Sequence, residues 1–189
     1  RDAVLTGITL TGGRAASGAG VLVATGLLER CIVRDNVATG DGGGCRLESS
    51  GIMRDCLITN NSSTTGRGGG AFLNSGGLVE NCRFYANSAP APNDVGRGGG
   101  IYVLGTGTIR NSLITGNTAG GRAGGVALNN GGLLDYCTVV GNAAPAGSGV
   151  RCDGGTVRNC IVWNNTPVAS NTFNSAAFSY IYTCVFPAI

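Results

Sequence analysis

A repeated unit is the feature of this sequence that most constrains its fold. Each copy opens with a glycine and a short apolar run, and successive copies start 24, 26, 30, 25 and 24 residues apart. Each copy holds three apolar runs, and Gly or Asn usually closes a run. Six copies in one register predict units that pack on their neighbours along an axis. The opening glycines are Gly20, Gly44, Gly70, Gly100, Gly125 and Gly149.

The pattern inside a copy is typical of strands. Helices need apolar residues three and four positions apart over ten or more residues, whereas here the apolar runs are short and alternate. In the copy that opens at Gly44, the runs are residues 45–47, 52–53 and 56–58. We therefore expect an all-β, right-handed parallel β-helix with three short strands per coil and about seven coils, its hand following the general rule for parallel crossovers.

The repeats do not cover the whole chain. We expect them to occupy residues 1–167, with residues 1–13 forming an incomplete first coil. The chain opens inside an apparent strand, which suggests a mature product or a piece of something longer. Residues 168–179 are polar, and strand character returns only at residues 180–189. We expect residues 168–189 to be an irregular segment plus a final strand that either caps the rod or leads into a further module.

The charge composition narrows the classes of function. The 13 basic residues are all arginine, histidine is absent, and the formal net charge is +3. A small, dispersed positive charge does not suit nucleic-acid binding. Apolar runs are far shorter than 18 residues, so we expect no membrane insertion. Without histidine, the chain cannot form a Ser-His-Asp or Cys-His catalytic site.

Eight cysteines recur mostly at one position of the unit, the start of the third apolar run. We expect all eight, Cys184 included, to point inward as a stack of free thiols. Stacked Cβ atoms should lie ~4.8 Å apart, whereas a disulfide prefers ~3.8 Å, so disulfides between adjacent coils are the less favoured alternative. The absence of CxxC pairs and of histidine argues against a metal or another cofactor. The recurring position holds Cys31, Cys56, Cys82, Ser112, Cys137 and Cys160.

An asparagine follows five residues after each of those positions. Asparagine tolerates left-handed backbone geometry, and stacked amides can hydrogen-bond to each other. We therefore expect a structural ladder made of Asn36, Asn61, Asn87, Asn117, Asn142 and Asn165.

The second apolar run ends at a charged position whose sign alternates from coil to coil. Like charges on stacked strands repel, so alternation avoids a penalty. We interpret this row as a solvated face rather than a binding stripe. Its members are Glu29, Arg54, Glu80, Arg110, Asp135 and Arg158.

The outward positions of the third run are unusually apolar for an exposed sheet face. Such a patch often marks an interface, although another part of the same parent protein, such as residues 168–189, could equally cover it. The partner would be another copy, further repeats of the parent chain, or a glycan. The candidate contact residues are Ile32, Leu57, Tyr85, Leu113, Val140, Ile161 and Trp163.

An enzymatic role has little support in the sequence. Glycoside hydrolysis needs two carboxylates about 5–9.5 Å apart, and a lyase needs a carboxylate cluster for Ca²⁺. Asp35 and Asp41 are the only plausible local pair, and the next coil has no acid at the matching positions. We therefore expect no catalytic residues, and polysaccharide cleavage stays an alternative.

Two motifs resemble those of a known family. The glycine-rich starts of two strands, at residues 69–72 and 98–101, and the FxxN form at residues 84–87 are similar to repeats of polymorphic outer-membrane proteins. The wider resemblance is to right-handed parallel β-helix proteins of bacterial surfaces, and the asparagine ladder resembles that of pectate lyases. The resemblance implies an extracellular or cell-surface structural, adhesin-like module, part of a filament or a longer surface protein. A polysaccharide-binding or polysaccharide-cleaving domain is the alternative.

Overall fold

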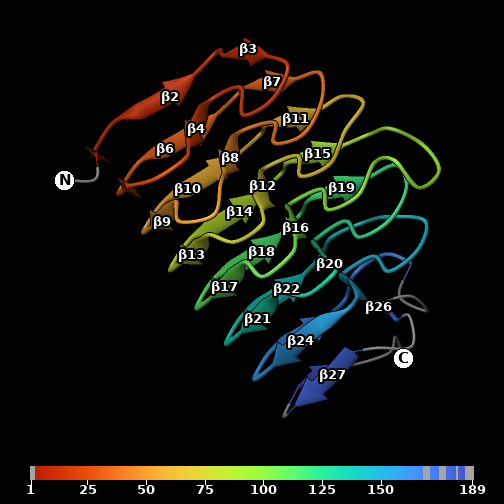
Figure 1. Cartoon of the computed structure of the whole chain (residues 1–189). Coiled ribbons are helices and arrows are strands. Elements are labelled where there is room, and N and C mark those ends of the chain that lie inside the picture. The colour runs from red at the N-terminus through yellow and green to blue at the C-terminus, as the bar shows by residue number, and fades with distance from the viewer. Residues whose placement is uncertain (1–2, 168–170, 175–177, 182, 186–189) are drawn as a thin grey trace.

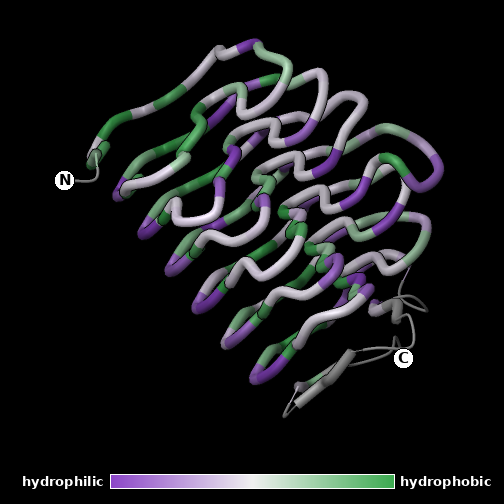
Figure 2. Tube along the Cα trace, viewed as in Figure 1, coloured by the Kyte–Doolittle hydropathy of each residue, from purple (hydrophilic) through white to green (hydrophobic). Residues whose placement is uncertain are grey.

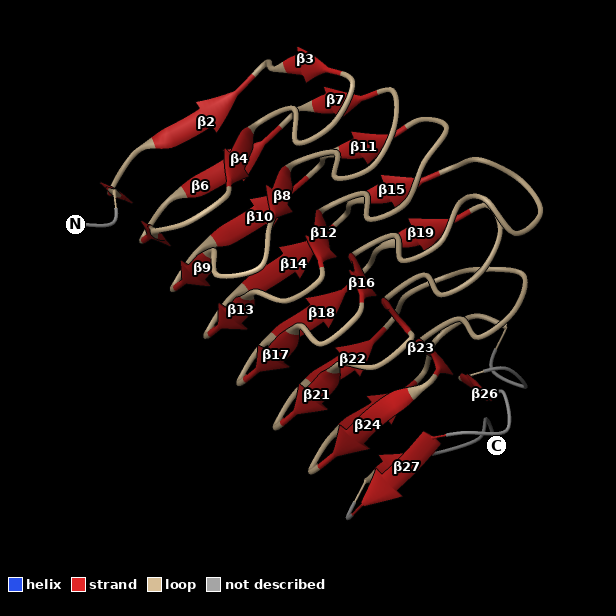
Figure 3. Cartoon of the chain, in the orientation of Figure 1, coloured by secondary structure: helices blue, strands red, loops and turns tan. Residues whose placement is uncertain are grey.

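The computed structural model describes residues 3–167, 171–174, 178–181 and 183–185. Within these residues every regular element is a strand, and helices are absent (Figure 3). The strands wind into stacked coils, with the N-terminus at one end of the stack and the C-terminus at the other (Figure 1). Each strand pairs in parallel with its equivalents in the neighbouring coils, so the fold is a parallel β-solenoid, as the repeat predicts.

Two of the four sheets contain eight strands each. Sheet A contains β1 (Val4–Thr6), β5 (Leu27–Glu29), β9 (Ile52–Arg54), β13 (Leu78–Glu80), β17 (Thr108–Arg110), β21 (Leu133–Asp135), β24 (Gly155–Arg158) and β27 (Phe178–Ile181). Sheet B contains β2 (Thr9–Thr11), β6 (Ile32–Arg34), β10 (Leu57–Thr59), β14 (Arg83–Tyr85), β18 (Leu113–Thr115), β22 (Thr138–Val140), β25 (Ile161–Trp163) and β28 (Cys184–Val185).

Two further sheets complete the coil. Sheet D, which the glycine-led runs form, contains β4 (Val21–Val23), β8 (Cys45–Leu47), β12 (Ala71–Asn74), β16 (Ile101–Leu104), β20 (Val126–Asn129), β23 (Val150–Asp153) and β26 (Thr172–Asn174). Sheet C contains β3 (Arg14–Ala15), β7 (Val37–Ala38), β11 (Ser62–Ser63), β15 (Ser88–Ala89) and β19 (Thr118–Ala119).

Sheet C adds a short fourth strand to several coils, beside the three strands per coil that the sequence predicts. Of its strands, β7, β11, β15 and β19 each occupy the two residues directly after a ladder asparagine. In each of β7, β11 and β15 the second residue, Ala38, Ser63 or Ala89, is fully buried. Two-residue strands give too short an alternation to be recognised in a sequence, yet their pairing defines the shape of this corner.

The C-terminal stretch also differs from the expectation. The described residues beyond 167 contain three strands, β26, β27 and β28, which extend sheets D, A and B. The sequence predicts only one final strand there. Residues 168–170 and 175–177, part of the expected irregular segment, lie outside the described residues.

The core fills the space inside the coils. The inward positions of sheets A, B and D form one continuous apolar cluster from Val23 to Val162. In Figure 2, hydrophobic colour follows the strands, and hydrophilic colour recurs at the corners of successive coils. The inward apolar residues of β4 to β25 are almost entirely buried, and among them only Val21 is partly exposed, near the N-terminal end.

Close contact between coils explains the glycine that opens each strand of sheet D. A Cβ atom at Gly70 would lie 2.6 Å from the carbonyl oxygen of Gly100, and one at Gly100 would lie 2.7 Å from that of Gly125. Because real Cβ atoms do not approach backbone oxygens so closely, a side chain here would push neighbouring coils apart. The repeated glycine is therefore a packing requirement of the stack.

Candidate functional site on the outer surface of the solenoid

The predicted asparagine ladder is confirmed. All six members are buried, and each accepts hydrogen bonds from the preceding coil at its Oδ1 atom. Asn36, for example, donates to Asn61 Oδ1 from its backbone N at 3.1 Å and from Nδ2 at 3.0 Å. Asn171 continues the ladder, since Asn165 donates to its Oδ1 at 3.0 Å. The pattern misses Asn171 because it follows Asn165 after six residues instead of a full coil.

All eight cysteines are free, and seven of them are buried. The backbone N of Cys31 donates to Cys56 Sγ at 3.4 Å, and that of Cys56 donates to Cys82 Sγ at 3.5 Å. In the next coil, Ser112 Oγ accepts from the backbone N of Cys82 at 3.1 Å. Serine therefore takes over the hydrogen bond that the thiol makes elsewhere.

Cys184 corrects the expectation that every cysteine points inward. It is exposed and pairs with Ile161, an outward residue of sheet B. Thr183 instead occupies the position that Cys160 holds one coil earlier, and its Oγ1 donates to the carbonyl of Val157 at 3.3 Å. A shift of one residue along a strand moves a side chain to the opposite face, and the broken repeat after residue 167 hides that shift.

Burial makes several of the thiols poor acids. Desolvation raises the pKa of Cys45 well above its usual range, with further repulsion from Cys56 and Cys31. Burial, together with the charge of Asp153, raises the pKa of Cys152 to about 11. These thiols stay protonated at neutral pH, whereas metal ligation and nucleophilic attack need the thiolate.

The candidate contact residues predicted on the third run all lie on the outer face of sheet B. Ile32, Tyr85, Ile161 and Trp163 are 38%, 48%, 49% and 53% exposed. Leu57, Leu113 and Val140 are half-buried on the same face. Parallel pairing aligns these side chains as two adjacent columns along the rod. We refer to these seven residues as the sheet B strip.

Arg83 and Thr138 divide the sheet B strip. Arg83 stands between Leu57 and Leu113 in one column, and Thr138 stands between Leu113 and Ile161. The guanidinium of Arg83 lies 5.8 Å from the ring centre of Tyr85, where it covers part of the aromatic face. The strip is therefore apolar with interruptions.

The alternating charges occupy the outer face of sheet A. Glu80 forms ion pairs with Arg54 at 3.1 Å and with Arg110 at 2.7 Å, both across coils. Asp135 pairs with Arg158 at 2.7 Å, and hydrogen bonding from Arg158 lowers the pKa of this carboxyl. Glu29 departs from this pattern, because it pairs with its neighbour Arg30 at 2.8 Å. The expected neutralisation within the row thus holds for most of its length.

The outer face of sheet D carries a cluster that the sequence argument missed. Phe72 and Tyr102 stack with ring centres 5.4 Å apart and planes 3° apart, and both are buried although they point away from the main core. Arg67 lies over both rings, and Arg46 lies over Phe72. An aromatic residue at an outward position, with an arginine just before the glycines of the same coil, is the signal that could have revealed this cluster.

Arginines also line the corner where sheet D begins. Arg97 and Arg122 are paired in adjacent coils, and Asp94 on the longest corner loop forms ion pairs with both. Beside them lies an open hollow of about 380 Å³, lined by Pro92, Asn93, Asp94, Gly120, Gly121, Arg122, Pro145 and Ala146. Asp94 therefore balances part of the positive charge of these arginines.

The two carboxylates weighed as a catalytic pair are each held by an arginine. Asp35 pairs with Arg34 at 2.7 Å, and Asp41 pairs with Arg67 at 3.5 Å. Asp41 also accepts a hydrogen bond from the backbone N of Arg67 at 2.9 Å. Over the described residues, no group of three or more Cys, Asp or Glu side chains has the arrangement of a metal site.

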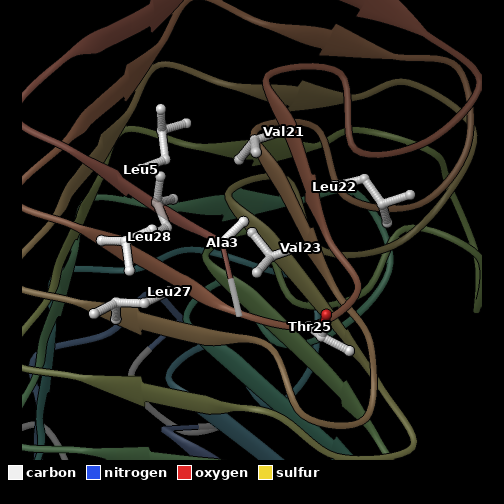
Figure 4. Close-up of a pocket in the computed structure, with 9 residues that line it drawn as sticks. Ala3, Leu5, Val21, Leu22, Val23, Thr25, Leu27 and Leu28 are labelled. Carbon is white, nitrogen blue, oxygen red and sulfur yellow. The ribbon is translucent and has the colours of Figure 1, made fainter. Parts of the chain in front are cut away.

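A second, apolar hollow of about 270 Å³ lies at the N-terminal end of the stack (Figure 4). Figure 4 shows Leu5 and Leu28 on one side and Val21 and Val23 on the other. These side chains belong to the inner surfaces of sheets A and D at the first coil. The hollow is the end of the core, open to solvent at this point.

Comparison with known proteins agrees with the architecture. None of the described residues belongs to a helix that could span a bilayer. No curated protein and no solved structure matches the chain significantly. The sequence model of the family described as right-handed β-helix region matches residues 2–142, which is most of the chain. Together with the parallel coils and the asparagine ladder, this match shows that the chain belongs to the right-handed β-helix family.

Proposed function

We propose that this chain is a non-catalytic structural and adhesive module of an extracellular or cell-surface protein. It assembles with copies of itself or with further coils of its parent chain, as part of a filament or a longer surface protein. The sheet B strip carries this proposal, because seven apolar or aromatic side chains share one outer face of the rod and none of them is fully buried. An exposed apolar patch on one face favours association, and Arg83 and Thr138 interrupt this one without removing it.

The composition of the strip supports an interface in particular. Tyr85 and Trp163 are about half exposed, and both residue types are enriched at protein interfaces. Their rings bury a large area while losing little conformational freedom. The flat, regular face allows the same contact to recur along the rod, which suits side-by-side packing of β-helices.

The finer family assignment belongs to the same proposal. We infer that the repeats are of the kind found in polymorphic outer-membrane proteins, whose GGA and FxxN motifs the chain resembles. One contact supports this inference: a Cβ at Gly70 would lie 2.9 Å from a ring carbon of Phe84 and 3.0 Å from Cγ of Asn87. The glycine of one motif therefore makes room for the Phe and Asn of the other, so the two motifs depend on each other.

Reduced thiols are compatible with an extracellular role. We infer that Cys31, Cys56, Cys82, Cys137 and Cys160, with Ser112 in one coil, form a thiol ladder beside the asparagine ladder. Their burial keeps oxidants away, and stacking on parallel strands holds their Cβ atoms further apart than a disulfide prefers.

A double substitution tests the assembly. Leu57→Lys with Leu113→Lys places two charges in the sheet B strip, and both side chains point away from the core. We expect weaker association in sedimentation velocity with an unchanged β-sheet circular dichroism spectrum. Leu22→Lys is the matched control, because Leu22 is 58% exposed on the outer face of sheet D. A wild-type protein that stays monomeric at high concentration contradicts the assembly and favours a strip covered by another part of the parent chain.

Binding of an acidic polysaccharide is the second candidate. Arg122, which lines the corner hollow, favours it, since guanidinium groups bind carboxylates well. Cosedimentation with polygalacturonate, compared between wild type and Arg122→Gln, tests this candidate.

We expect neither the wild type nor Arg122→Gln to depolymerise pectin or alginate. Cleavage that disappears in Asp35→Asn or Asp41→Asn would overturn the non-catalytic proposal.

A further inference from the structure

We propose that the outer face of sheet A is a self-complementary interface on which a second copy of this chain packs with its rod axis antiparallel. This inference rests on the assembly proposed above, and it assigns that assembly a second face and a defined orientation. The evidence is the order of charges along the rod, together with an apolar column that runs beside them.

Two outward columns make up this face. One column is the charge row Glu29, Arg54, Glu80, Arg110, Asp135 and Arg158, which strand pairing holds in a single register. Two residues earlier on the same strands runs a half-buried column of Leu27, Ile52, Leu78, Thr108, Leu133 and Thr156. The face is therefore a charged stripe beside a mostly apolar stripe.

The charge row is complementary to itself when its order is reversed, because it has an even number of positions. It alternates in sign over six positions, an even number, so reading it backwards exchanges acid for base at every position. A twofold axis parallel to the strands, midway between two facing sheets, reverses the order of coils and keeps the position along each strand. Glu80 then faces Arg110 of the second copy, Arg54 faces Asp135, and Glu29 faces Arg158.

The same axis brings the apolar columns together. Ile52 faces Leu133 of the second copy, while Leu78 faces Thr108 and Leu27 faces Thr156, so every facing pair includes at least one aliphatic side chain. A twofold axis along the rod would instead place the charge row of each copy against the apolar column of the other. The charged groups would then have no partners of opposite sign across the interface. Twofold contacts use the same patch on both partners, and opposite charges at matched positions set their register.

The side chains of the row can make these contacts while keeping their own partners. The side chains of Arg54, Arg110 and Arg158 are 37%, 45% and 44% exposed, whereas Glu80 and Asp135 are only 14% and 9% exposed. The arginines are therefore the outermost charged groups. Each guanidinium has five N–H donors and each carboxylate several acceptor sites, so an arginine can bridge acids of both copies. Facing sheets pack about 10 Å apart, a distance that such side chains span.

Two charge reversals provide a test that a fold defect cannot mimic. Glu80→Arg alone sets arginine against Arg110 twice in the homodimer, and Arg110→Glu alone sets glutamate against Glu80 twice. When the two variants are mixed, both central contacts of the heterodimer pair an acid with a base. We expect each variant alone to associate at least about tenfold more weakly than wild type, and the mixture to recover to within about threefold. Sedimentation equilibrium of the two proteins, separately and mixed, measures this.

The controls separate this face from the assembly as a whole. Arg14→Glu makes the same charge change as Arg110→Glu on the exposed edge of sheet C, and we expect it to leave association unchanged. Circular dichroism must show an intact fold for every variant, and added salt must weaken the wild-type dimer. Association that survives both single reversals but disappears in the Leu57 and Leu113 variant overturns this face alone. Single reversals that abolish association without recovery on mixing overturn the antiparallel register, and a monomeric wild type overturns both proposals.

Discussion

Asn87 Nδ2 donates to Asn117 Oδ1 at 2.9 Å, one coil further along the rod. The same nitrogen donates to the carbonyl of Ile58 at 2.9 Å, and the Oδ1 of Asn87 accepts two bonds from Asn61. One buried amide therefore satisfies polar groups on both neighbouring coils. The asparagines hold the corner between sheets B and C by a continuous chain of such bonds.

Replacing Asn87 with alanine should destabilise the fold strongly. The change leaves the backbone N and Nδ2 of Asn61 and the carbonyl of Ile58 without this partner in the core. We expect a loss of about 3 kcal/mol in the free energy of unfolding, as unsatisfied buried polar groups typically cost. Urea unfolding followed by circular dichroism measures it. The control is Asn74→Ala, which removes one half-buried bond to Glu48 and should cost below about 1 kcal/mol. Equal losses in both variants would contradict the ladder's role.

Gly70→Ala tests whether the opening glycine is needed for close packing or for backbone freedom. The new Cβ would meet the carbonyl oxygen of Gly100 at 2.6 Å, so adjacent coils must separate. We expect a loss of more than about 3 kcal/mol or failure to fold. Gly7→Ala is the comparison, because Gly7 has a φ of +71° but open space around it. There we expect only the backbone penalty of about 1 kcal/mol. A Gly70 variant as stable as the Gly7 variant would show that packing is not the reason for the repeat.

Thiol reactivity should divide the cysteines into two groups. In native protein, Cys184 should react quickly with a thiol reagent, while the seven buried cysteines react only on unfolding. Cys184→Ser should remove the fast phase. In denaturant without reductant, most of the eight should titrate as free thiols. Recovering four disulfides instead would disprove the thiol ladder.

The buried thiols should also make the fold sensitive to alkali. An unfolded cysteine titrates near pH 8.5, whereas the folded pKa of Cys45 is higher and that of Cys152 is about 11. Above pH 8.5 the unfolded chain loses these protons first, so the free energy of unfolding should fall by up to about 1.4 kcal/mol per pH unit for each thiol. For Cys152 the fall ends near pH 11, and below pH 8.5 its contribution is constant.

Urea unfolding between pH 7.5 and 10.5 measures this slope. Cys45→Ala should reduce the slope, after allowance for its lower overall stability. A slope that Cys45→Ala does not alter would contradict burial as the cause.

The repeat by itself determines most of the fold. Alternation within the apolar runs predicts strands with an inward and an outward face, and the constant five-residue offset of each asparagine from the start of the third run predicts the ladder. These predictions succeed because each residue packs on the equivalent residue of the next coil when the coils stack in register. Residues one repeat apart in the sequence are therefore neighbours in the structure. The outward placement of the sheet B strip follows from the same alternation.

The tertiary structure decided what the period does not encode. Sheet C consists of two-residue strands, too short to leave a pattern, and the coil after residue 167 places Asn171 and Cys184 out of the expected spacing. The burial of Phe72 and Tyr102 on an outer face depends in part on Arg67, whose side chain arrives from the loop before β12. The contact between Arg67 and Tyr102 joins residues whose separation is not a whole repeat. Sequence periodicity shows which residues occupy equivalent positions in successive coils. How a side chain lies across an outer face depends instead on the shape of the corners, and only the packed coil defines that shape.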